Sequence, residues 1–326
     1  QQVLEPCHNA GHGILTRSPY ILPEGNIQIA FSGGRSSAYM LHQILDANGS
    51  LRDDVEVTFQ NTGREMPETL DFVQQCGSRW GVRVTWMEYA PRRPLSRAEF
   101  DMITKHFGES YAERLREWWC VSETGYRVVS HNAAAQLGEP FVALILMRKF
   151  LPNQQARFCS TELKVRTAKR YLRGLGWDYW TNCVGIRADE PGRIKPEGVR
   201  FKDRWTVWQP MVKAGISKRD VAAFWRAQSF DLRLPNVKGK CWLGNCDGCF
   251  LKAEANIAAL HREFPERGIW WEQCEALASE LTSGTAAAFS KRYTRAEMAD
   301  FMDRQGDWAL STEGVLCQVD DGECTG

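Results

Sequence analysis

Three cysteines lie close together in the stretch KCWLGNCDGCFLK, residues 240–252. They are Cys241, Cys246 and Cys249, and the glycines between them give the backbone freedom to wrap around an ion. Thiolates at this spacing are typical ligands of zinc or of an iron–sulfur cluster, and both sites require a fourth ligand. The stretch therefore predicts a metal site that takes one more side chain from elsewhere in the sequence. The alternative is a set of unrelated free thiols.

The other cysteines and the histidines are the candidates for this fourth ligand. Cys76 falls in a helical pattern and Cys183 in a β-rich run, so we expect both to be small core residues. Cys159 lies in ARFCSTELK between Arg157 and Lys164, and these cations favour a thiolate. Cys159 is therefore the favoured partner of the three clustered cysteines.

A second chemical motif is AFSGGRSSAYM, residues 30–40, which follows the apolar run NIQIAF and opens a helical pattern. A glycine loop between a strand and a helix directs backbone N–H groups and the positive end of the helix dipole at an anion. Hydroxyls and an arginine add further donors. The loop is predicted to bind phosphate or pyrophosphate, and the alternative is a plain turn with a serine N-cap. Its residues are Ser32, Gly33, Gly34, Arg35, Ser36 and Ser37.

A third motif, VGIRADEPGR, combines two arginines with two carboxylates. Arg187 and Arg193 can hold a phosphate or sulfate through paired hydrogen bonds. Asp189 and Glu190 offer the hard oxygen ligands that Mg²⁺ prefers on a polyphosphate. A solvated turn is the alternative, because DEPG is also good turn chemistry.

The stretch LKVRTAKR, residues 163–170, contains the cations Lys164, Arg166, Lys169 and Arg170. The sequence favours two interpretations equally: a solvated helix face, or a path for a polyanionic substrate.

These motifs must be positioned by alternating strands and helices. Residues 26–31, 55–63 and 82–89 are predicted strands, and helical patterns follow the first two. This order favours a parallel sheet with helices on both faces, which binds ligands at the carboxyl ends of its strands. Further along the chain we expect a strand at 178–187 and helices at 217–228 and 253–265.

Composition limits the class of protein. The 326 residues are 43% hydrophobic and 25% charged with a net charge of +1, an ordinary globular balance that argues neither for nor against nucleic acid. No apolar run is long enough for a membrane span, and eleven cysteines without a secretion signal favour a reducing cytoplasm. We expect a leader at 1–25, a nucleotide-binding domain at 26–210, a helical cysteine segment at 211–315 and a flexible tail at 316–326.

SGGRSS resembles the phosphate loop of the PP-loop ATP pyrophosphatases, the adenine nucleotide alpha-hydrolase-like superfamily. FQNTGREMPETLDFV, LPNQQARFCSTELKVRTAKRYL, VGIRADEPGR and GNCDGCFLK resemble segments of its phosphoadenosine phosphosulfate reductase branch, the last as in phage and bacterial members with an iron–sulfur cluster. The resemblance implies a Rossmann-like α/β fold with a mostly helical C-terminal segment that carries the cysteines. It also implies that Asn61, Thr62 and Gly63 border ATP or an adenylyl sulfate nucleotide. It places a cysteine at Cys159 and favours a [4Fe–4S] cluster over zinc.

The resemblance further implies an enzyme that cleaves ATP at the α-phosphate, adenylates an acceptor and releases pyrophosphate. Arg35, Arg187, Asp189 and Glu190 are then the predicted catalytic residues, with Mg²⁺ on the polyphosphate. The acceptor, a nucleic acid or a small molecule, takes up sulfur from a donor or reductant protein. One alternative is a thiol-dependent sulfonucleotide reductase, although Cys324 in the tail is followed by threonine where that group has glycine. Another is a non-catalytic nucleotide-binding component of a phage or defence assembly.

Overall fold

The computed structural model describes residues 18–196, 204–236 and 243–305. This part of the chain contains a six-stranded sheet with the strand order β4-β3-β2-β1-β5-β6. Five strands are parallel, and β4 pairs antiparallel with β3 at one edge. The bounds are β1 (Ile27–Ala30), β2 (Val55–Asn61), β3 (Val84–Tyr89), β4 (Tyr126–Val129), β5 (Trp180–Val184) and β6 (Trp205–Trp208).

The predicted α/β fold is confirmed, and the sheet is parallel except at β4. That strand is short and partly exposed, and it follows a pair of helices that returns the chain to the edge of the sheet. An antiparallel edge strand on an otherwise parallel sheet is common in α/β proteins. β6 was not expected either, because the WTVW run is too short to stand out from the sequence pattern.

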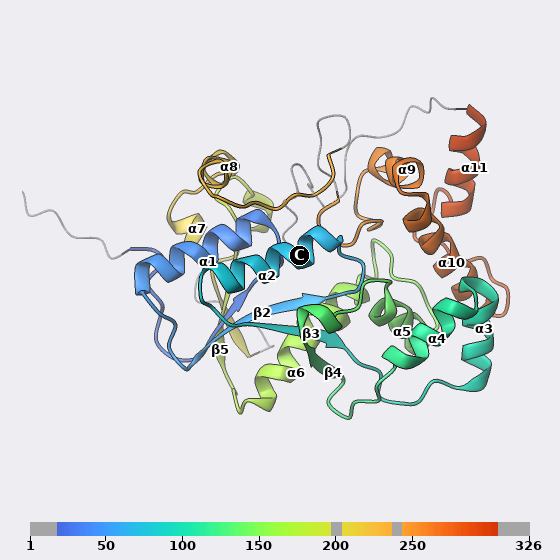
Figure 1. Cartoon of the computed structure of the whole chain (residues 1–326), viewed down its shortest axis with the longest axis horizontal. Coiled ribbons are helices and arrows are strands. Elements are labelled where there is room, and N and C mark those ends of the chain that lie inside the picture. The colour runs from blue at the N-terminus through green and yellow to red at the C-terminus, as the bar shows by residue number, and fades with distance from the viewer. Residues whose placement is uncertain (1–17, 197–203, 237–242, 306–326) are drawn as a thin grey trace, which may run out of the picture.

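Helices cover both faces of the sheet. Figure 1 shows α1 (Arg35–Asn48) and α2 (Pro67–Arg79) on one side and α6 (Thr167–Gly174) on the other. A π-helical turn, Ser160–Arg166, leads directly into α6. The other α-helices are α3 (Arg97–Phe107), α4 (Glu109–Trp118), α5 (Glu139–Arg148), α7 (Pro210–Lys213), α8 (Lys218–Arg226), α9 (Glu254–Glu263), α10 (Pro265–Leu281) and α11 (Arg295–Gln305).

The two faces of the sheet differ in polarity because side chains alternate along each strand. The face toward α1 carries Ile27, Ile29 and Phe59, all fully or almost fully buried. The opposite face carries polar side chains in the same strands, including Gln28, which donates to Thr58 Oγ1 at 2.9 Å. One face therefore forms an apolar core, whereas the other is suited to a polar ligand.

One hydrophobic core extends from the sheet into the C-terminal helices. Trp270 and Trp271 in α10 both pack edge-on against Phe141 in α5. The expected core assignment of Cys76 and Cys183 is confirmed. The cysteine segment therefore shares its core with the sheet.

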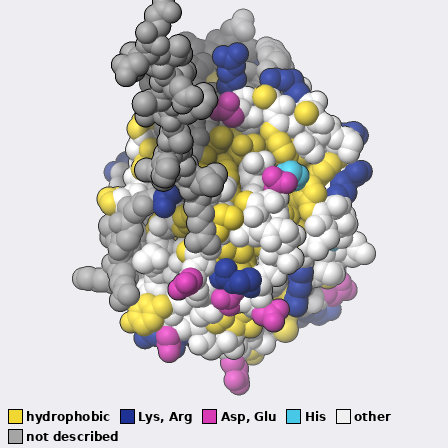
Figure 2. Space-filling view, turned by 90° about the vertical axis from the view of Figure 1, so that its left-hand side faces the viewer, with side chains coloured by type: hydrophobic (Ala, Val, Ile, Leu, Met, Phe, Trp, Pro, Cys, Tyr) yellow, Lys and Arg dark blue, Asp and Glu magenta, His cyan; other side chains and the backbone are white. Residues whose placement is uncertain are grey.

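Charge is mixed on the surface. On the face shown in Figure 2, Lys and Arg side chains lie beside Asp and Glu, in keeping with the net charge of +1. In the described parts of the chain, no helix combines the length and apolar character needed to cross a membrane.

Candidate functional site

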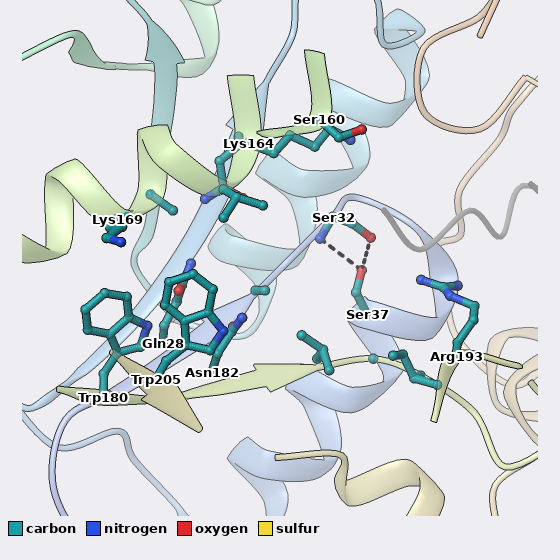
Figure 3. A pocket seen from close by; sticks show the side chains of 17 residues that line it. Gln28, Ser32, Ser37, Ser160, Lys164, Lys169, Trp180, Asn182, Arg193 and Trp205 are labelled. Atoms are coloured by element: carbon teal, nitrogen blue, oxygen red, sulfur yellow. Dashed lines mark hydrogen bonds between the residues drawn. The ribbon is translucent and has the colours of Figure 1, made fainter. Parts of the chain in front are cut away.

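The predicted phosphate loop connects β1 to the N-terminus of α1. Gly33 has a φ of +81°, a conformation that favours glycine. The Ser37 hydroxyl accepts a hydrogen bond from Ser32 N at 3.2 Å and donates to Gly34 O at 2.9 Å, which holds the loop in a tight curve (Figure 3). The first N–H groups of a helix have no partner within the helix, so those of α1 can bind an anion.

Two glycines are also required by close packing around this loop. A Cβ atom at Gly33 would lie 2.7 Å from the Thr69 methyl carbon, and one at Gly185 would lie 2.9 Å from Ser37 Cα. The end of β5 therefore passes directly against the first turn of α1. A substitution at Gly33 would strain the fold as well as obstruct an anion.

A cavity of about 190 Å³, which we call the phosphate-loop cavity, opens on the polar face of the sheet. Figure 3 shows Ser32 and Ser37 toward one end and Gln28, Asn182, Trp180 and Trp205 toward the other. Gln60 Nε2 and Asn182 Oδ1 are buried and have no hydrogen-bond partner among the described residues. One donor and one acceptor are thus available to a ligand.

Sequence reasoning missed Gln28, Gln60 and Asn182. The available signal was a polar residue at the centre of an otherwise apolar strand, as in NIQIAF and WTNCV. Such a residue is costly to bury without a partner, so it indicates either a hydrogen-bond network or a ligand.

Arg187 connects the third motif to the phosphate loop. It is 7% exposed, and its Nη1 donates to Ser36 Oγ at 3.0 Å while its Nε donates to Asp189 Oδ1 at 2.9 Å. Glu190 accepts from Arg187 N and from Arg193 Nη1. Burial alone would raise the pKa of Asp189, but hydrogen bonds from Lys218 N and Arg187 lower it overall.

These contacts bring the two arginines to the site. The carboxylates of Asp189 and Glu190, however, accept hydrogen bonds from these same arginines. Arg193 lines the phosphate-loop cavity, whereas Asp189 and Glu190 are not among its lining residues. Their role as Mg²⁺ ligands stays a prediction that requires these carboxylates to exchange partners.

Arg35 is directed away from the loop it belongs to. Its Nε and Nη2 donate to the two carboxylate oxygens of Asp231 at 2.8 and 2.5 Å. A direct role on the phosphates stays a prediction, and it would require Arg35 to leave this bidentate pair.

The residues of the turn after β2 have two different roles: two shape the turn and one lines a cavity. Asn61 is fully buried and donates to Glu88 Oε1 and Ala135 O, while its Oδ1 accepts from Gly63 N. Asn61 and Gly63 therefore shape the turn. Thr62 lines a second cavity, where its Oγ1 lies 3.2 Å from Cys246 Sγ.

This second cavity, of about 390 Å³, is the thiol cavity. Cys159, Cys246 and Cys249 line it, so three of the four predicted metal ligands converge on one space. Cys241 lies outside the described residues. Ser160, Lys164, Ile186 and Arg193 line both cavities, and the thiol cavity therefore adjoins the phosphate-loop cavity.

The cysteines that line this cavity are half-buried. Burial, followed by the neighbouring Cys249, raises the pKa of Cys159 to about 11, and burial also raises the pKa of Cys246 well above its usual value. These groups are neutral thiols at pH 7 unless a cation or metal ion binds them. Within the described ranges no group of three or more His, Cys, Asp and Glu is placed to hold a metal ion. The four-cysteine ligand set stays a prediction.

A buried ion network holds the cysteine loop against the turn after β2. Asp247, which is fully buried, accepts from Arg64 Nη2 and Arg267 Nη1, each at 2.6 Å, and from Trp271 Nε1 at 2.8 Å. Asp247 N also donates to Arg64 O. Burial would raise the pKa of Asp247, but the charges of Arg64 and Arg267 lower it overall. Sequence reasoning did not identify this network.

Comparison with known proteins finds a family match in the first part of the chain. Residues 26–118 match the family described as phosphoadenosine phosphosulfate reductase domain. The chain is 27% identical over 273 residues to the "Uncharacterized nin region protein ORF290" of Escherichia phage lambda, covering 83% of this chain and 79% of that protein. It is 24% identical over 318 residues to the "Uncharacterized 37.8 kDa protein in gpa 5'region" of Escherichia phage 186, covering 88% of each.

Among solved structures, the chain aligns with the phosphoadenylyl-sulfate reductase of Candida auris in its phosphate complex. The TM-score is 0.35 and the identity 16%, over 66% of this chain and 81% of that chain.

Proposed function

We propose that the protein is an adenine-nucleotide-dependent enzyme of sulfur chemistry, because residues 26–118 match the phosphoadenosine phosphosulfate reductase domain, in agreement with the family expected from the motifs. Its reaction is the cleavage of ATP at the α-phosphate to adenylate an acceptor, which then takes up sulfur. The observation that carries this proposal is the contact between the two cavities. The cavity at the phosphate loop and the cavity lined by three cysteines share four lining residues, Ser160, Lys164, Ile186 and Arg193.

The phosphate-loop cavity supports an adenine nucleotide in particular. Amide side chains recognise adenine by accepting from its exocyclic amine and donating to a ring nitrogen. Asn182 Oδ1 supplies this acceptor, and it lies beside Gln28 toward the end of the cavity opposite the serines. Gln28 and Ser32 lie four residues apart in an extended run, or roughly 13 Å, which is of the order of a nucleotide's length.

The chemistry follows from the charges at the cavity. An acceptor oxygen attacks the α-phosphorus, the bond to the bridging oxygen breaks, and pyrophosphate leaves with the electron pair. The N–H groups at the start of α1, together with Lys164 and Arg193, stabilise the charge that develops on this leaving group. A sulfur nucleophile from a donor protein then displaces AMP from the activated acceptor.

We further propose that Cys159, Cys241, Cys246 and Cys249 bind a [4Fe–4S] cluster, with zinc as the alternative. The three described thiols share one cavity, and an all-thiolate set suits either group. A bound cluster would hold the C-terminal segment beside the nucleotide. Anaerobic purification followed by an optical spectrum and iron, sulfide and zinc analysis tests this assignment.

A second candidate is the thiol-dependent reduction of an adenylyl sulfate, which releases sulfite. The family match and the thiols beside the phosphate loop favour it. Incubation with ATP and assay of pyrophosphate tests the first reaction. Incubation with adenylyl sulfates and a reduced thiol protein, with assay of sulfite, tests the second. Nucleotide binding without either product would support a non-catalytic role instead.

A further inference from the structure

One side of α6 and of the π-helical turn before it is a row of cations. Arg166, Lys169, Arg170 and Arg173 occupy positions i, i+3, i+4 and i+7, which places them on one side of a helix. The opposite side of α6 is buried through Thr167, Ala168, Tyr171 and Leu172. Packing therefore accounts for one side of the helix and leaves the basic side toward solvent.

Among the described residues, fewer carboxylates than arginines pair along this row. Glu162 serves Arg148, Arg166 and Arg170 together, and Asp178 pairs with Arg173 at 3.5 Å. Burial would raise the pKa of Glu162, but these three arginines lower it overall, so it stays ionised. Positive charge is therefore concentrated here, although the whole chain is nearly neutral.

The row borders a cavity of about 580 Å³, which we call the α6 groove. The groove and the phosphate-loop cavity share Val165, Lys169 and Trp205 as lining residues. Thr161 also lines the groove and is adjacent in sequence to Ser160, which lines both cavities of the candidate site. The groove therefore forms a track from solvent to the place where nucleotide and thiols meet.

We propose that the α6 groove binds the sugar–phosphate backbone of a nucleic-acid strand. Arginine matches phosphate oxygens with paired donors, and the threonine hydroxyls add further donors. An acidic protein partner fits less well, because protein interfaces have an apolar centre and only Val165 and Trp205 supply apolar side chains here. That this strand is also the acceptor of the reaction rests on the proposed function.

The test compares two double variants that remove the same charge. Arg166→Gln with Arg173→Gln neutralises the groove, and both residues lie outside the lining of the phosphate-loop cavity. Arg97→Gln with Arg116→Gln is the control, because these arginines also pair with a nearby carboxylate but lie on α3 and α4. Binding of fluorescein-labelled single-stranded RNA, single-stranded DNA and duplex DNA is measured by anisotropy at several salt concentrations.

We expect wild type and control to bind a strand with the same salt dependence. The groove variant should bind about tenfold more weakly at 0.1 M salt, and its slope of log K against log salt should be shallower by roughly 1.4 for two lost phosphate contacts. The arms with RNA, DNA and duplex identify the form that binds best. Equal weakening in the control, or binding of an acidic polypeptide but of no nucleic acid, would overturn the proposal.

The same experiment separates this inference from the proposed function. ATP binding is measured in parallel in the absence of nucleic acid, where the groove variant should match wild type. Strand binding by a protein that does not bind ATP would contradict the proposed function and leave the groove in place. ATP binding without strand binding would contradict the inference about the α6 groove and leave the proposed function in place.

Discussion

At the scale of single residues, the site depends on a few buried polar groups whose partners come from distant parts of the chain. Asp247 receives two guanidinium groups and an indole N–H within a space closed to water. Asn182 and Gln60 have the opposite character, because each keeps a buried polar atom unpaired among the described residues. The first arrangement fixes the cysteine loop, and the second leaves hydrogen-bonding capacity for a ligand.

Asp247→Asn should destabilise the protein. Loss of the carboxylate leaves Arg64 and Arg267 buried without their counter-charge, and breaking a buried pair in this way costs about 3–5 kcal/mol. The free energy of unfolding from urea titration measures the effect. Asp101→Asn, which breaks the exposed pair with Arg97, is the control and should cost less than about 1 kcal/mol. Equal losses would show that the network contributes no more than a surface pair.

Asn182→Ala should weaken ATP binding by about tenfold, the ~1.4 kcal/mol expected for one hydrogen bond to the base. It should also reduce the ratio of the affinity for ATP to that for GTP, because the Asn182 Oδ1 acceptor is proposed to bind the exocyclic amine of adenine. Isothermal titration with both nucleotides measures the two effects. Asn26→Ala is the control, since Asn26 lies at the exposed start of the same sheet and donates to Tyr179 O. A loss of affinity equal for ATP and GTP would remove Asn182 from base recognition.

At the scale of elements, the N-terminus of α3 shows how local sequence alone can build structure. Ser96 and Glu99 form a capping box in which each side chain binds the backbone N–H of the other, and Arg93 adds a salt bridge to Glu99. Burial would raise the pKa of Glu99, but the Arg93 and Ser96 hydrogen bonds lower it to about 2.

This shift predicts a pH dependence of stability. A carboxyl whose pKa is lowered in the folded state stabilises the fold above its unfolded pKa, here about 4.3. That contribution is lost as the pH falls from about 4.3 toward the folded value of about 2. Glu99→Gln should therefore be less stable than wild type at pH 6, with the difference shrinking below pH 4, as measured by thermal unfolding. A constant difference across that range would contradict the ionic origin.

At the scale of the whole molecule, the C-terminal helices and the sheet share one core, and the cysteine loop meets the turn after β2 inside it. Cys159, on the sheet side, faces Cys246 and Cys249 across the thiol cavity. A metal bound by all of them would close a loop of many residues, which stabilises a fold by restricting the unfolded chain.

Cys159→Ser should therefore lose most of the bound iron and make residues from about 235 onward more sensitive to protease. Iron analysis of anaerobically purified protein and limited proteolysis measure the two effects. Cys183→Ala is the control, because Cys183 is fully buried and its thiol contacts Met40 in the core. Full iron content in the Cys159 variant would show that this thiol is not a ligand.

The sequence by itself determined the order of the first strands and helices, the phosphate loop and the cysteine loop. Each of these depends on local spacing: apolar periodicity, glycines between a strand and a helix, or cysteines a few residues apart. The core assignments of Cys76 and Cys183 followed from the same patterns.

Only the tertiary structure decided which groups meet. It turned Arg35 toward Asp231 and buried Asn61 against Glu88, because a side chain's partners come from elements far apart in sequence. It placed β4 antiparallel and joined Asp247 to Arg64. Local patterns carry no record of these pairings, since they arise from how helices and strands pack once the chain has folded.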